Sequence, residues 1–60
     1  MIKEYDRIRL KTGERGQILE ILDDDTYLAE IISKEGDVDT TEIKKTAIKA
    51  IIVEHEKLLV

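Results

Sequence analysis

Three consecutive aspartates, Asp23, Asp24 and Asp25, are the densest set of metal-ligand side chains in this chain of 60 residues. A calcium loop needs oxygen ligands at alternating positions and a glycine at its sharp turn, and no glycine follows these aspartates directly. Short acidic side chains also hydrogen-bond their own backbone in turns. The triplet therefore predicts a solvated acidic turn, and we expect no metal and no other cofactor.

Side chains able to act in nucleophilic catalysis are few. The single histidine, His55, lies between Glu54 and Glu56 with no serine near it in the sequence, and the chain contains no cysteine. Ser33 has no activating partner beside it, and the glycine-bounded segment 13–17 lacks the Gly-Lys-Ser/Thr ending of a phosphate-binding loop. The sequence therefore predicts a protein that is not an enzyme and has no small-molecule substrate.

Basic residues gather early in the chain, at a spacing that suits one face of a strand. Arg7, Arg9 and Lys11 alternate with two apolar residues, the pattern of a half-buried strand. Such a cluster can neutralise phosphates, but a net charge of −4 and only two aromatic residues disfavour nucleic acid. Charged side chains also protect an edge strand against aggregation. The candidate patch for nucleic acid or another anion contains Arg7, Arg9, Lys11 and Arg15.

Acidic charge is confined to the middle third of the chain. Residues 23–42 contain eight acidic residues and one lysine, a net charge of −7, whereas the two flanking segments carry +1 and +2. A lopsided charge distribution steers a protein toward a charged partner. One hypothesis is therefore that the chain binds a basic partner through Asp23, Asp24 and Asp25, as a small inhibitor or immunity-type protein does.

Length and composition indicate one small folded domain over residues 1–60. Ten isoleucines and six leucines supply a core, and β-branched side chains favour strands over helices. The longest apolar run, residues 50–53, is far shorter than the roughly 20 residues that span a bilayer. The first residues carry alternating charges and no apolar signal region. We expect a cytoplasmic protein without membrane association.

Turn residues divide the first two thirds of the chain into strands. The sequence predicts strands over residues 7–11, 17–22 and 27–33, with a hairpin turn over residues 34–37. In the third strand, alternation places Leu28 and Ile32 on the face opposite the presumed core.

The second predicted strand has an irregular apolar spacing. Ile18 and Ile21 are three residues apart, so both side chains point inward only if a β-bulge intervenes. Gly16 lies close enough to ease that bend.

The last third of the chain supports two predictions. One is a strand over residues 38–43 and another over 50–53, with a short helical turn between them. The alternative is a three-stranded β-meander plus a long C-terminal helix that begins at Asp39, because Asp39 and Glu42 fit a capping box. The β-prone run at residues 51–53 favours strands.

Two sets of residues carry a resemblance to known small barrels. Asp6, Arg7, Ile8, Arg9 and Leu10, followed by Gly13, Gly16, Ile18 and Ile21, resemble a KOW motif. The continuation Thr26-Tyr27-Leu28-Ala29-Glu30-Ile31, then Gly36, Ile43 and Ile48, is similar to SH3-like barrels of uncharacterised bacterial proteins. The resemblance covers residues 5–52 and implies a five-stranded SH3-like barrel with a short helical turn before its last strand. It also implies a binding module of bacterial or phage origin.

The resemblance extends the basic patch as well. Because the first and last strands of an SH3-like barrel are neighbours, Lys49 is expected to join the patch, with Lys44 and Lys45 as an extension. This arrangement is the basis for the alternative function, a KOW-like module that binds RNA or DNA.

A protein partner accounts for more of the sequence than nucleic acid does. Leu28 and Ile32 are apolar residues on the expected outer face, and the tail from residue 53 ends in Leu58, Leu59 and Val60. Apolar residues near a terminus are usually tied down by packing or by a partner. The sequence therefore predicts a non-catalytic protein-interaction module that binds a protein partner or a second copy of itself, with a homodimer preferred.

Overall fold

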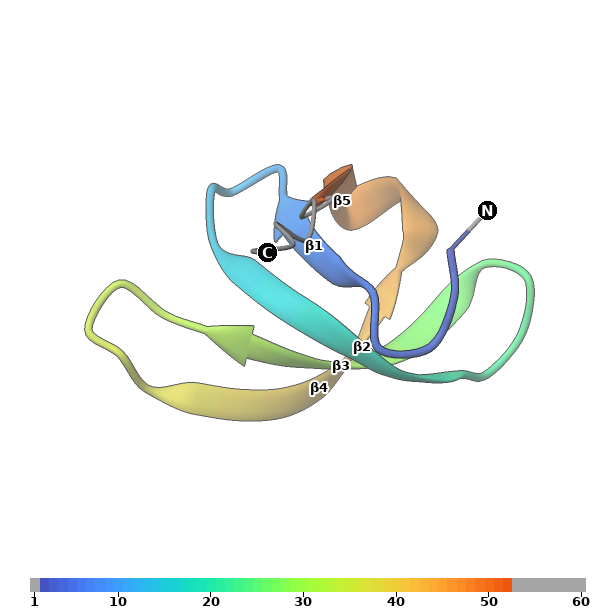
Figure 1. Ribbon diagram of the computed structural model, residues 1–60, viewed down its shortest axis with the longest axis horizontal. Coiled ribbons are helices and arrows are strands. Elements are labelled where there is room, and N and C mark those ends of the chain that lie inside the picture. Colours follow the sequence, from blue (N-terminus) through green and yellow to red (C-terminus); the bar gives the residue numbers. More distant parts are fainter. Residues whose placement is uncertain (1, 53–60) are drawn as a thin grey trace, which may run out of the picture.

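The computed structural model describes residues 2–52, which form five β-strands and one turn of 3₁₀-helix (Figure 1). In chain order these elements are β1 (Arg7–Leu10), β2 (Arg15–Ile21), β3 (Thr26–Ile32), β4 (Val38–Lys44), η1 (Lys45–Ala47) and β5 (Ile48–Ile52). The predicted all-β architecture, with a helical turn before the last strand, is confirmed. Within the described range, no helix is long and apolar enough to cross a membrane.

The alternative C-terminal helix is wrong over the described residues. Asp39 and Glu42 lie inside β4, and the chain resumes as β5 after a single 3₁₀ turn. The β-branched Thr40, Thr41 and Ile43 of β4 suit a pleated strand better than a helix. Pairing with β3 along the whole of β4 therefore outweighs the local capping signal.

All five strands belong to one antiparallel sheet in the order β4-β3-β2-β1-β5. The first and last strands are therefore neighbours. Figure 1 shows the sheet strongly curved, with the hairpin of β3 and β4 reaching beyond β1.

The core lies on one face of this curved sheet. Its buried residues are Ile8, Leu10, Ile18, Tyr27, Ala29 and Ile31. Five half-buried residues pack against them, namely Ile2, Ile43, Ala47, Ile48 and Ile51. Two of these, Ala47 and Ile48, come from η1 and the start of β5, so the 3₁₀ turn serves to bring apolar side chains onto the core.

The expected β-bulge is present in β2. Ile18 pairs with Ala29 and Glu20 pairs with Leu28, which leaves Leu19 as the extra residue. The bulge returns Ile21 to the core side, although its side chain is still 41% exposed.

Gly16 has a steric role of its own in β2. A Cβ at this position would lie 2.6 Å from the Glu30 carbonyl oxygen and 2.6 Å from Ile31 Cδ1, closer than van der Waals contact allows. Only glycine lets β2 approach β3 this closely.

The turn between β1 and β2 sets where β2 begins. The Leu10 amide donates to the Glu14 carbonyl at 2.8 Å, and Gly13 supplies the required positive φ of +100°. This tight closure lets pairing start at Arg15, two residues earlier than predicted, and so makes Arg15 the strand partner of Arg9.

Candidate binding site on the outer face of the sheet

The side of the sheet opposite the core carries the cationic residues of β1 and β2. Arg7 and Arg9 flank the buried Ile8, so both side chains point away from the core. Arg7 pairs with Gln17, and Arg9 pairs with Arg15. Because directly opposed residues share a face, these four side chains lie together on the outer surface.

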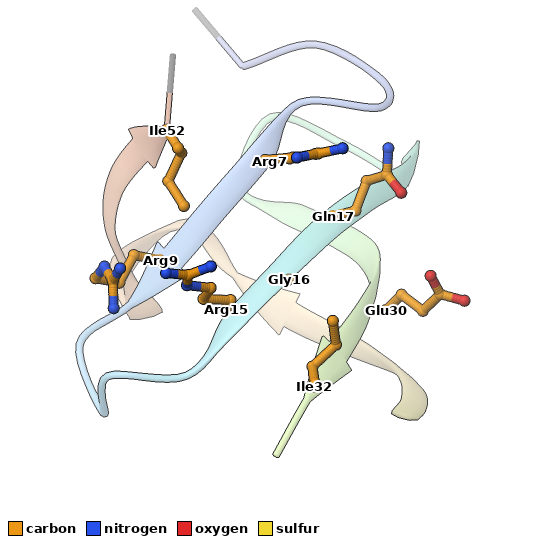
Figure 2. A pocket seen from close by; sticks show the side chains of 8 residues that line it. All are labelled: Arg7, Arg9, Arg15, Gly16, Gln17, Glu30, Ile32 and Ile52. Carbon is orange, nitrogen blue, oxygen red and sulfur yellow. The ribbon is translucent and has the colours of Figure 1, made fainter. Parts of the chain in front are cut away.

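A hollow of about 410 Å³ opens among these side chains (Figure 2). It is lined by Arg7, Arg9, Arg15, Gly16, Gln17, Glu30, Ile32 and Ile52. Figure 2 shows Arg9 and Arg15 side by side at one end of β1 and β2, and Arg7 beside Gln17 toward the other end. The other labelled side chains are Ile52 on β5, and Glu30 and Ile32 on β3. We call this feature the arginine hollow.

The arginine hollow concentrates positive charge. Arg9 and Arg15 are directly opposed like charges, an arrangement that destabilises a sheet. Arg9 Nη1 donates to the Gly13 carbonyl at 3.3 Å, whereas no acidic side chain within residues 2–52 lies at ion-pair distance from Arg15. The clustered guanidinium groups favour an anionic ligand, since each can bind a carboxylate through two parallel hydrogen bonds.

Gln17 is held in place by the segment that precedes β1. Its Nε2 donates to the Tyr5 carbonyl at 3.1 Å, and Tyr5 itself has a φ of +70°, rare for a bulky residue. The Tyr5 amide donates to the Ile18 carbonyl at 2.7 Å, and the Ile18 amide donates to the Asp6 carbonyl at 2.9 Å. These bonds fix the end of the hollow at Arg7 and Gln17.

Next to Arg15, the β3 side of the hollow is apolar. Ile32 pairs with Arg15 on one side and with Val38 on the other. The side chains of Ile32 and Val38 are 46% and 54% exposed. One row across the sheet therefore runs from two arginines, Arg9 and Arg15, to two exposed aliphatic side chains.

Comparison with family models, with curated proteins and with solved structures finds no match for this chain.

The structure brings together three of the five predicted cationic site residues. Arg7, Arg9 and Arg15 line the hollow, whereas Lys11 and Lys49 do not. Lys11 follows β1 and its amide donates to the Ala47 carbonyl at 2.9 Å; Lys49 is exposed on β5.

Among the predicted apolar site residues, Ile32 lines the hollow and Leu28 lies on the same face but outside it. Leu28 is half-buried and pairs with Glu42. The remaining three, Leu58, Leu59 and Val60, lie outside the described residues, as does His55. The predicted homodimer stays a prediction.

Four lining residues were absent from the predicted site, namely Gly16, Gln17, Glu30 and Ile52. Glu30 lies between Leu28 and Ile32 on the same face of β3, and its pairing with Gln17 puts both beside the arginines. The period-two alternation of β2 and β3 therefore indicates which side chains share the outer face. Only the pairing register shows which of them lie opposite one another.

The aspartate turn lies between β2 and β3, away from the hollow. Asp23 Oδ1 accepts a hydrogen bond from the Asp25 amide at 2.9 Å, the local bonding that the sequence predicted. This bond is the main reason that the pKa of Asp23 lies below its ordinary value, with further contributions from Thr26 and from the charge of Lys44.

The last residue of β4, Lys44, and the first residue of η1, Lys45, lie beside this acidic turn. Lys44 Nζ donates to Thr26 Oγ1 at 3.0 Å, and the Lys45 amide donates to the Asp25 carbonyl at 2.8 Å. The expectation that Lys44 extends the arginine patch is therefore wrong, because β4 pairs with β3 at the opposite edge of the sheet from β5.

Within residues 2–52, no group of three or more His, Cys, Asp or Glu side chains is arranged to hold a metal ion.

Proposed function

We propose that this chain is a non-catalytic protein-interaction module that holds an acidic segment of a partner protein in the arginine hollow. The observation that carries the proposal is the direct opposition of Arg9 and Arg15 beside Arg7. Two directly opposed cations, Arg9 and Arg15, raise the free energy of the unbound protein, and an acidic ligand relieves that repulsion.

The composition of the hollow favours a protein over a nucleic acid. Glu30 lines it and would repel a chain of phosphates, while Ile32 and Ile52 offer apolar walls that phosphates cannot use. Of the two tyrosines, Tyr27 is buried and Tyr5 does not line the hollow. Aromatic stacking, a large part of single-stranded nucleic-acid affinity, therefore has no platform at this site.

Two further features support a binding role without catalysis. The residues that line the hollow include no serine, threonine, cysteine or histidine, so none of them supplies a hydroxyl, thiol or imidazole nucleophile. The resemblance to KOW-like and SH3-like barrels points to the same class, because such barrels are mostly binding modules.

The second hypothesis, an acidic inhibitor that acts through Asp23, Asp24 and Asp25, gains less support. Lys44 Nζ donates to Thr26 Oγ1 at 3.0 Å, which places a cation of the same chain beside this acidic turn.

Selection from a phage-displayed library of random twelve-residue peptides tests the proposal. We expect the wild-type protein to enrich acidic sequences, and we expect the Arg9→Glu/Arg15→Glu variant to lose that enrichment. The matched control is Lys11→Glu/Lys49→Glu, which reverses two cations outside the hollow and should behave as the wild type. Equal enrichment by both double variants, or no acidic enrichment at all, would contradict the proposal.

A further inference from the structure

We infer that the partner segment is an extended peptide that crosses the strands, with an acidic residue over Arg9 and Arg15 and aliphatic residues two and four positions away over Ile32 and Val38. This inference rests on the proposed function and specifies the partner's chemistry and spacing.

The row of side chains across the outer face fixes this order. Pairing aligns Arg9 with Arg15, Arg15 with Ile32 and Ile32 with Val38, one residue on each of β1, β2, β3 and β4. The first two positions are cationic, and the last two are aliphatic and about half exposed. A ligand that matches the row carries negative charge at one end and apolar side chains at the other.

Strand spacing converts this order into a sequence pattern. Adjacent strands lie about 4.8 Å apart, so a carboxylate held midway between Arg9 and Arg15 lies about 7 Å from Ile32 and about 12 Å from Val38. An extended peptide advances roughly 3.3 Å per residue, and every second side chain points to the same side. Residues two and four positions from the acid therefore face Ile32 and Val38.

The neighbouring row prevents the opposite placement. Arg7, Gln17 and Glu30 follow one another across β1, β2 and β3. Glu30 lies beside the aliphatic end, so an acidic residue placed there would meet a like charge, whereas over β1 and β2 it meets Arg9 and Arg15. The hollow thus selects peptides in which acidic and aliphatic residues are segregated at a fixed spacing.

Fluorescence anisotropy with synthetic peptides tests this pattern. The matched probe is a fluorescein-labelled twelve-residue peptide of serine and glycine that contains one glutamate and leucines at two and four positions after it. In a second matched probe the order is reversed, so that the leucines lie two and four positions before the glutamate. The control probes have the same composition, with the leucines moved to one and three positions from the glutamate. We expect one of the matched orders to bind at least fivefold more tightly than its control.

Protein variants assign the contacts. Ile32→Ser is expected to weaken the matched probe about fivefold and to leave the control probes unchanged. Leu22→Ser is the matched variant, because Leu22 is 43% exposed and does not line the hollow. Equal binding of matched and control probes, or equal effects of the two variants, would overturn this inference and leave the proposed function standing. Failure of every acidic peptide, or tighter binding of a twelve-nucleotide oligothymidine, would overturn both.

Discussion

Replacing Arg15 with glutamine is expected to stabilise the unbound protein while it weakens the binding of an acidic ligand. Arg15 lies directly opposite Arg9, and no acidic side chain within residues 2–52 pairs with it. The substitution removes one charge of a repulsive pair and keeps much of the side chain's apolar stem. If Arg15→Gln makes the protein more stable but weakens its binding of an acidic ligand, the positive charge of Arg15 serves binding and not folding.

The expected gain follows from Coulomb's law for an exposed, directly opposed cross-strand pair. Two unit charges about 7 Å apart in water repel by about 0.6 kcal/mol, within the roughly 0.2–1 kcal/mol range seen for cross-strand pairs. In a domain this small, 1 kcal/mol shifts Tm by roughly 4–8 °C. Arg15→Gln should therefore raise Tm by about 1–5 °C at low ionic strength.

Thermal unfolding followed by circular dichroism measures this shift. Lys49→Gln is the control, since Lys49 is an exposed cation outside the hollow. Both variants make the net charge of −4 more negative, so general charge repulsion alone would destabilise both. About 0.5 M salt should shrink the difference between Arg15→Gln and wild type, because exposed charges are then screened over a few ångströms. A Tm for Arg15→Gln at or below that of Lys49→Gln would refute the reasoning.

Three further predictions concern the scaffold. Gly16→Ala places a Cβ 2.6 Å from the Glu30 carbonyl oxygen and should lower the free energy of unfolding by about 1–3 kcal/mol. Circular dichroism should detect this loss as a lower Tm, and a wild-type Tm would contradict the close approach of β2 and β3. The carboxyl of Asp23, whose pKa lies below 3.8 in the folded protein, stabilises the fold above that pH, and the contribution is lost as the pH falls through the lowered value. Carboxyl NMR titration should place its midpoint under 3.8, and a higher midpoint would contradict the turn geometry. Lys44→Met removes the 3.0 Å bond to Thr26 Oγ1 and should cost about 1 kcal/mol in urea unfolding; an unchanged free energy of unfolding would contradict a net contribution from this bond.

The sequence was informative where one face of a strand is buried and the other is solvated. Alternation in Arg7–Leu10 and in Thr26–Ile32 predicted which side chains face the core, and burial in the structure agrees. The spacing of Ile18 and Ile21 predicted a bulge that the pairing places at Leu19. These features are local, so period-two patterning and turn residues suffice to find them.

The candidate site could be predicted only in part because it depends on non-local pairing. Arg7 and Arg9 were grouped by their spacing on one strand, but the opposition of Arg15 to Arg9 depends on the tight closure at Gly13. Lys44 was misplaced, because which edge of the sheet β4 joins is a property of the whole topology.

Chemical-shift mapping of the ¹⁵N-labelled protein with an acidic-aliphatic peptide tests the proposed binding surface most directly. The matched peptide probe should shift the backbone amides of β1, the first half of β2 and the end of β3, around Arg9, Arg15 and Ile32. The Arg9→Glu/Arg15→Glu variant should show no such shifts. Shifts confined to the Asp23–Asp25 turn, or none at saturating peptide, would contradict the assignment of the arginine hollow as the binding surface.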